Sequence, residues 1–175
     1  MASPLVSVVM TAYKAQATLQ AAIDSVLAQT WRNLELVIVD DASPDEGWDV
    51  VRRASALDGR VRGIRLARNG GPYRAKNLAL KSVRGALVTF HDSDDVSHPA
   101  KIEAQVAALQ QRGRAASLSH WIRMGADGIC IPARTGRYVR RNFSSLMVRR
   151  EMLDRIGYFD SVRVSADSEY IDRIR

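Results

Sequence analysis

Three carboxylates stand within four residues in the segment His91-Asp92-Ser93-Asp94-Asp95. Like charges this close repel one another unless water, hydrogen bonds or a cation offset them. In an extended chain Asp92 and Asp94 point to the same side, because side chains alternate with a period of two. Two convergent carboxylates suit Mg²⁺ or Mn²⁺, which are commonly held by one or two carboxylates together with substrate phosphates. Aspartate clusters also form turns and helix caps, so this segment alone fits a metal site and a turn equally well.

Four apolar runs of the chain each end in residues that could bind a ligand. In open parallel sheets ligands bind at the carboxyl ends of the strands, so we expect these groups to lie together. An aromatic ring and a carboxylate could hold a base, arginines could contact phosphate, and the acidic segment could hold a metal. No phosphate-loop motif is present, and each Asp pair also fits a plain turn after a strand. In chain order the candidates are Thr11, Ala12 and Tyr13; Asp40 and Asp41; Arg68 and Arg74; and Asp92, Ser93 and Asp94.

The segments that must position these residues alternate between buried-strand and helix patterns. Apolar, β-branched runs predict strands at 5–10, 35–39, 61–66 and 86–90, since a strand buried on both faces is apolar at nearly every position. Apolar residues at helical spacing predict helices at about 18–29, capped by Thr18, at 47–57, at about 73–84 and from 99 onward. This alternation predicts an α/β fold with a mainly parallel sheet and helices on both faces.

The pattern changes in the second half of the chain. We expect strands at 115–124, 128–131 and 143–148, a basic and irregular connection at 134–142, and helices at 149–156 and 167–175. A length of 175 residues suits a single domain. The prediction is therefore one Rossmann-like domain with a smaller antiparallel part in its C-terminal half.

The net charge of +7 rests on 26 basic residues, 22 of which are arginines, and predicts an anionic partner. A nucleoside diphosphate and a phospholipid surface both fit. Nucleic acid is less favoured, because the densest basic cluster, 134–141, contains only one aromatic residue, Tyr138. This cluster could contact an anionic or lipid-linked acceptor, although a solvated loop is the better interpretation.

A single cysteine, Cys130, excludes an intrachain disulfide, and we expect it to be buried or half-buried. No signal peptide or membrane-spanning run is expected. These features predict a cytoplasmic protein, with peripheral association at the inner face of the membrane left open. His91, His98 and His120 lack metal-ligand spacing and are expected to be structural or solvent-facing.

In order, these segments resemble the family 2 glycosyltransferases, which are inverting, nucleotide-sugar-dependent enzymes with the GT-A fold. Residues 6–13 resemble the opening strand and nucleotide contact of the family, and 35–43 its second strand with a paired Asp. Asp92-Ser93-Asp94 resembles the D-x-D motif. Gly157-Tyr158-Phe159-Asp160 resembles the G-x-F-D stretch, and Ser165-Ala166-Asp167 stands where the family places its catalytic base. The resemblance covers essentially the whole chain.

The resemblance implies a role for each matched residue of the donor site. Thr11 and Tyr13 would lie beside the nucleobase with Tyr13 stacking, and Asp41 would accept from a base N–H, which favours uracil. Asp92 would approach the ribose or the metal, and Asp94 would ligate a Mn²⁺ or Mg²⁺ that bridges the diphosphate. The implied reaction moves a sugar from a nucleotide diphosphate to a saccharide or lipid-linked acceptor, as in bacterial polysaccharide biosynthesis.

Asp167 would be the general base for the acceptor hydroxyl, which is a poor nucleophile until it loses its proton. A helix N-terminus would favour its ionised form. The alternative is that Asp167 only caps a helix, with Ser165 as a rival cap, and Asp160 and Glu169 are possible substitutes for the base.

The resemblance also implies two halves, 1–112 for the nucleotide-sugar and 113–175 for the acceptor. The sequence departs from the family at Thr11, often proline, at Lys14, often asparagine, and at Ala166, usually acidic. After 175 there is no Q-x-x-R-W-type segment, so one alternative is that the chain is a truncated fragment of a larger enzyme. Another alternative is a non-catalytic nucleotide-sugar binding module. A flavodoxin-like domain with an Asp40-Asp41 phosphoacceptor pocket is less favoured, because that acidic pair should follow the first strand.

Overall fold

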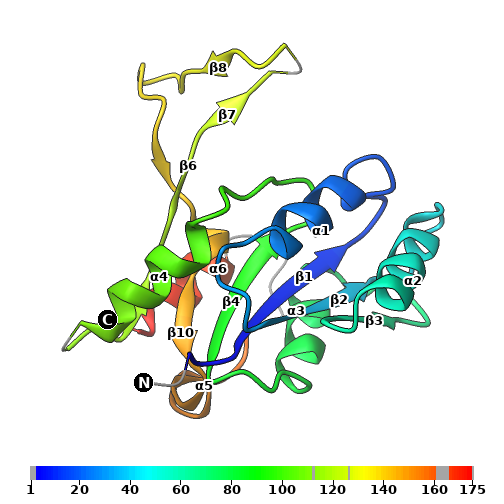
Figure 1. Ribbon diagram of the computed structural model, residues 1–175, viewed down its shortest axis with the longest axis horizontal. Helices are drawn as coiled ribbons and strands as arrows, with labels where there is room; N and C mark the ends of the chain where they lie inside the picture. The colour runs from blue at the N-terminus through cyan, green and yellow to red at the C-terminus, as the bar shows by residue number, and fades with distance from the viewer. Residues whose placement is uncertain (1–2, 112, 126, 161–165, 175) are drawn as a thin grey trace.

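A six-stranded sheet in the order β3-β2-β1-β4-β10-β5 forms the centre of the computed structural model, which describes residues 3–111, 113–125, 127–160 and 166–174 (Figure 1). Strands β1 to β4 are parallel, and β10 is antiparallel to both β4 and β5. This confirms the mainly parallel sheet. The strands are β1 (Val6–Ala12), β2 (Leu34–Asp40), β3 (Val61–Arg65), β4 (Leu87–Asp92), β5 (Ala116–Ser117) and β10 (Met147–Arg149).

Helices cover both faces of the sheet, as the sequence predicts. Along β1, Val8 and Met10 enter one hydrophobic cluster and Val9 enters the other, because neighbouring side chains of a strand point to opposite faces. The first cluster contains α1 (Leu19–Leu27), α2 (Gly47–Leu57) and α4 (Lys101–Gln110). The second contains α3 (Pro72–Leu80), α5 (Arg150–Ile156) and α6 (Ala166–Asp172).

Several predicted local features differ in the structure. Thr18 precedes α1 but does not cap it: its hydroxyl donates to the carbonyls of Ala15 (3.3 Å) and Ser93 (3.0 Å). Helix α3 ends at Leu80, four residues earlier than predicted. The segment 143–148 is not all strand, since Phe143–Ser145 forms a 3₁₀ turn (η1) in which the Ser145 hydroxyl donates to the Asn142 carbonyl.

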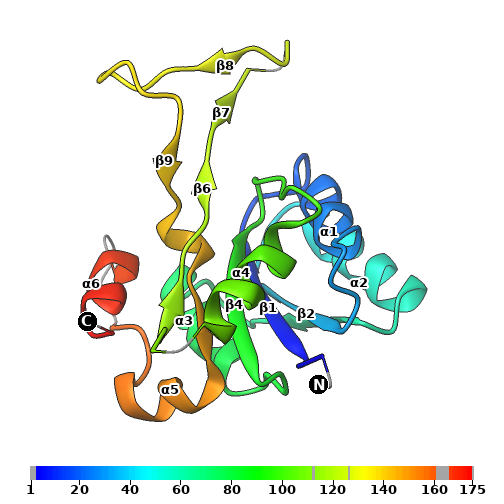
Figure 2. The ribbon, with the colours of Figure 1, turned by 60° about the vertical axis from the view of Figure 1, so that its left-hand side comes forward.

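Residues 119–125 and 127–142, here called the arm, project from the body and contain two short antiparallel strand pairs (Figures 1 and 2). The prediction of an irregular connection over 134–142 is wrong for its last part, because Arg140 and Arg141 form a strand that pairs with His120 and Trp121. Cys130 is exposed rather than buried, because it lies on this arm. The strands are β6 (His120–Trp121), β7 (Arg123–Met124), β8 (Cys130–Ile131) and β9 (Arg140–Arg141). Within the described ranges, no helix is long and apolar enough to cross a membrane.

Candidate functional site

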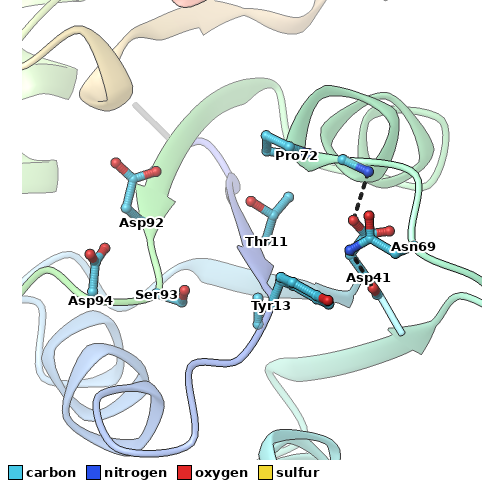
Figure 3. A pocket seen from close by; sticks show the side chains of 10 residues that line it. Thr11, Tyr13, Asp41, Asn69, Pro72, Asp92, Ser93 and Asp94 are labelled. Carbon is cyan, nitrogen blue, oxygen red and sulfur yellow. Dashed lines mark hydrogen bonds between the residues drawn. The ribbon is translucent and has the colours of Figure 1, made fainter. Parts of the chain in front are cut away.

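A cavity of about 360 Å³ opens at the carboxyl ends of β1 and β4 (Figure 3). The register of the sheet creates it, since β1 pairs Thr11 with Asp92 on β4 and Ala12 with Asp40 on β2. Seven predicted residues line this cavity: Thr11, Ala12, Tyr13, Asp41, Asp92, Ser93 and Asp94. Three further residues line it: Asn69 and Gly71 belong to the loop before α3, and Pro72 is the first residue of α3.

The aromatic side of the cavity is Tyr13, whose side chain is exposed and whose ring lies 5.4 Å from the Lys14 ammonium. Lys14 has φ 54°, and Ala42, which follows Asp41, has φ 56°. The left-handed region is costly for residues with a side chain, and such strain concentrates at functional sites. Both strained residues directly follow a cavity residue, so the backbone is held in an uncommon conformation on two sides of the opening.

Asp41 holds the loop that forms another wall of the cavity. Its buried carboxylate accepts hydrogen bonds from Gly70 N (2.8 Å) and Gly71 N (2.7 Å), and its carbonyl accepts one from the Asn69 amide (3.2 Å). Gly71 has φ 88°, a conformation that favours glycine. The predicted contact of Asp41 with a base would therefore add to a structural role that the sequence did not indicate.

Asp40, Arg68 and Arg74 are not among the residues that line the cavity. Asp40 is fully buried, where it pairs with the Arg65 guanidinium (3.3 Å) and accepts a hydrogen bond from Ser43 N (3.2 Å). Arg68 and Arg74 are both exposed, and Arg74 folds over Gly70, where a Cβ atom would collide with it.

The acidic segment forms the remaining side of the cavity. Figure 3 shows the Asp92 and Asp94 side chains extending in the same direction from the end of β4. Neither carboxylate forms an ion pair within the described part of the chain. Partial desolvation and then repulsion from Asp92 and Asp94 raise the pKa of Asp95. Burial lowers the pKa of Lys101 to about 8, although attraction to Asp95 and Asp92 opposes this.

Lys101 offsets this repulsion only in part, since the pKa of Asp95 is still raised, and the charge of a divalent cation would offset it further. Over the residues that the structure describes, no group of three His, Cys, Asp or Glu side chains could hold a metal. A cation at Asp92 and Asp94 would therefore need further oxygen ligands, such as those of a diphosphate. The preceding His91 is buried, and burial lowers its pKa to about 4, so it is neutral at pH 7.

Asp167 lies in the first turn of α6 and is not among the cavity-lining residues. Its Oδ1 accepts a hydrogen bond from the Lys76 ammonium at 2.8 Å, in an ion pair whose side chains are 25% and 6% exposed. The ammonium also lies 5.3–5.7 Å from the ring centroids of Tyr73, Phe90 and Phe159. Lys76 was not among the predicted site residues, although its position three residues before the buried Ala79 indicates a lysine on the apolar face of α3.

The other acidic residues near α6 are also paired. Asp160 and Glu169, the predicted substitutes for the base, both contact the Arg173 guanidinium. Ser165 lies outside the described residues. Helix α6 begins at Ala166, so Asp167 is within the helix and not at its cap position.

Comparison with known proteins finds similar glycosyltransferases. A family model described as "Glycosyl transferase family 2" matches residues 7–171. The chain is 35% identical over 125 residues to a putative teichuronic acid biosynthesis glycosyltransferase, TuaG, of Bacillus subtilis, covering 71% of this chain and 50% of that protein. It is 37% identical over 106 residues to a UDP-Glc:α-D-GlcNAc-diphosphoundecaprenol β-1,3-glucosyltransferase, WfaP, of Escherichia coli, covering 61% of this chain and 41% of that protein.

Solved structures show the same fold. A mannosyltransferase from Pyrobaculum calidifontis in complex with GDP-Man and Mn²⁺ superposes with a TM-score of 0.77 at 20% identity, covering 98% of this chain and 52% of that one. The chain thus spans about half the length of the curated relatives and of the structure to which it was compared.

Proposed function

The chain belongs to glycosyl transferase family 2, and from that membership we propose that it transfers a sugar from a UDP-sugar to an acceptor hydroxyl with inversion, releasing UDP. One observation carries the proposal. The exposed ring of Tyr13, the Asp41 wall and two carboxylates without an ion pair among the described residues, Asp92 and Asp94, line one cavity. A planar base and a diphosphate with its cation require this combination of groups at opposite sides of a single site.

The binding roles follow from the chemistry of each side. Tyr13 stacks on the base, with Thr11 beside it, and Asp41 accepts a base N–H with a lone pair that the loop amides leave free. Asp92 and Asp94 would hold Mn²⁺ or Mg²⁺, and the complex of the similar mannosyltransferase with GDP-Man and Mn²⁺ supports a cation in this fold. When bound, that cation supplies positive charge where the leaving diphosphate gains negative charge. Arg68 and Arg74, which are exposed, stay candidates for phosphate contact.

Asp167 is the proposed general base. In a single displacement it takes the acceptor hydroxyl proton, the acceptor oxygen bonds to the sugar C1, and the C1–oxygen bond to the diphosphate breaks. Lys76 engages only Oδ1, so Oδ2 would take the proton. Residues 1–112 supply the donor site and 113–175 the acceptor side.

A saccharide or lipid-linked acceptor fits this proposal, because WfaP, to which the chain is similar, is described as a glucosyltransferase for a GlcNAc-diphosphoundecaprenol acceptor. Work on such an acceptor would place the protein in the cytoplasm, at the inner face of the membrane.

A second candidate is a nucleotide-sugar binding module without catalysis. The Lys76–Asp167 pair favours it, since the pair gives Asp167 a structural role away from the cavity lining. Release of UDP from a panel of UDP-sugars separates the two. The transferase releases UDP, whereas the module binds donor and releases none.

Metal-dependent UDP binding tests the donor site. We expect Mn²⁺ to strengthen UDP binding in calorimetry and raise the melting temperature with UDP, as for any ligand that binds only the folded state. Asp94→Asn should remove most of this effect, about tenfold in affinity, since it removes a charged oxygen ligand. Asp95→Asn is the matched control, with the same charge change one residue away and outside the cavity lining.

Binding of GDP and ADP is measured in parallel. If no nucleoside diphosphate stabilises the chain with or without Mn²⁺, the proposed function is wrong. If Asp95→Asn weakens binding as much as Asp94→Asn, the assignment of the ligands is wrong.

A further inference from the structure

The arm exposes apolar side chains that the fold does not use. Ile122, Met124, Ile129 and Ile131 are 44–65% exposed, and no described residue of the arm belongs to either hydrophobic cluster of the body. An isolated two-stranded ladder is only marginally stable in water. The arm therefore presents an apolar surface, and a partner that covered this surface would stabilise the arm.

The apolar side chains occur on both faces of the ladder. Register pairs Arg123 with Ile131 and Met124 with Cys130. Directly paired residues share a face and consecutive residues alternate, so Ile131 lies on one face and Met124 on the other. A protein partner would cover one face of so thin a ladder. A membrane–water interface into which the arm inserts would surround both faces.

The net positive charge of the arm indicates that the surface it binds is anionic. Five arginines (123, 134, 137, 140 and 141) stand against a single aspartate, Asp127, in residues 119–142. At the base of the arm, the guanidinium groups of Arg123 and Arg140 lie 5.5 and 5.0 Å from the Trp121 ring. A second copy of this chain would bring the same positive charge, which disfavours self-association and favours an anionic surface.

The arm leaves the body at the edge of the sheet where the cavity opens. Strand β10 pairs Met147 with Thr89 in antiparallel register, and Ser117 on β5 pairs with the same Met147. The residues after Ser117 and before Met147 therefore lie beyond the carboxyl end of β4, the end that carries Asp92 and Asp94. The arm, which projects from the body in Figures 1 and 2, therefore leaves the molecule on the side where β4 ends, and the residues that follow β4 line the cavity.

We propose that the arm docks the protein onto an anionic phospholipid bilayer, with its apolar side chains in the interface and its arginines on lipid phosphates. Amphipathic segments bind bilayers through this combination of apolar area and basic charge. The arginine stems reach along the apolar surface while their charged heads stay at the phosphates. Docking in this way turns the cavity edge toward the membrane. Docking on the bilayer does not depend on the proposed function. The further idea that docking brings a lipid-linked acceptor to the cavity does rest on the proposed function.

A fluorophore on Cys130 tests the proposal directly, since Cys130 is the single cysteine and is exposed on β8. A polarity-sensitive probe attached there should shift to the blue with vesicles of phosphatidylglycerol and phosphatidylcholine. It should not shift with phosphatidylcholine alone, and high salt should reduce the shift. The control carries the probe on α2, in the variant Cys130→Ser/Arg53→Cys, and should show no shift.

Sedimentation with the same vesicles measures the contribution of charge. Arg134→Gln/Arg137→Gln should weaken binding about fivefold for each arginine and about 25-fold for both. The matched control, Arg53→Gln/Arg155→Gln, removes two exposed arginines of α2 and α5 and should stay within about twofold of the unmodified chain.

Apolar insertion is tested with Ile129→Ser/Ile131→Ser, which should also weaken binding. Its control is Leu57→Ser, which alters an 88% exposed leucine at the end of α2. Urea unfolding verifies that each variant is folded. Equal binding of arm and control variants overturns the proposal, as does absence of binding to anionic vesicles. A lipid-independent dimer that forms Cys130–Cys130 crosslinks also overturns it, because a second copy then covers the arm.

Discussion

Replacing Asp167 with asparagine is expected to lower the stability of the fold, in addition to abolishing sugar transfer if Asp167 is the base. The substitution removes the carboxylate that pairs with Lys76 and leaves an ammonium whose side chain is only 6% exposed. Removal of one partner from a buried pair costs about 3–5 kcal/mol. Asp167 is 25% exposed, and three aromatic rings near the ammonium offset part of the loss. We therefore expect a loss of about 2 kcal/mol in the free energy of unfolding.

A double-mutant cycle measures this coupling by urea unfolding at pH 7. Lys76→Met removes the charge and keeps a long side chain that packs well on aromatic rings. Each single variant should lose about 2 kcal/mol. The variant Lys76→Met/Asp167→Asn should lie within about 1 kcal/mol of the unmodified protein, because no unpaired charge stays buried. UDP release in this double variant then tests the base without the stability loss.

The cycle can refute the reasoning in two ways. An unchanged unfolding midpoint for Asp167→Asn, or energies that simply add, would show that the pair does not contribute in solution. If the double variant is stable and still releases UDP at the unmodified rate, Asp167 is not the base, whatever the stability data show.

Two further predictions concern the edge of the cavity. Asp41→Asn replaces one acceptor oxygen with a donor facing the Gly70 and Gly71 amides, so we expect a loss of about 2 kcal/mol in unfolding and weaker UDP binding by calorimetry; no change in either would contradict its role in the wall. The pKa of His91 is lowered by burial from 6.5 to about 4, so the unfolded state binds a proton first as the pH falls. Stability is then complete above pH 6.5 and decreases toward pH 4, by about 2 kcal/mol between pH 7 and pH 5. Urea unfolding at the two pH values should show a smaller decrease for His91→Asn, and an equal decrease would contradict this cause.

The parallel core and most of the residues that line the cavity could be predicted from the sequence, because both depend on local patterns. The apolar run of β2 requires burial on both faces, and the loops that follow such strands meet at one edge of the sheet. The positions of Thr11 and Asp92 follow from this rule without any knowledge of side-chain contacts.

The remaining features depend on contacts between distant residues. Lys76 meets Asp167 across 91 positions, and only the packing of α3 against α6 brings them together. The turn before α3 gave no indication that its amides hold Asp41. Likewise, Arg140 and Arg141 show no strand pattern, since their pairing depends on β6.

The Thr18 hydroxyl, which donates to the Ser93 carbonyl instead of capping α1, links this helix to the acidic segment. A ligand that displaces the backbone of Ser93 must break or stretch this bond, and the N-terminal turn of α1 then loses a tether that a conventional cap would have kept internal. A ligand that moved Ser93 would in this way favour local opening of the first turn of α1. We would then expect amide exchange in that turn to respond to binding at Asp92 and Asp94, although no residue of the turn lines the cavity.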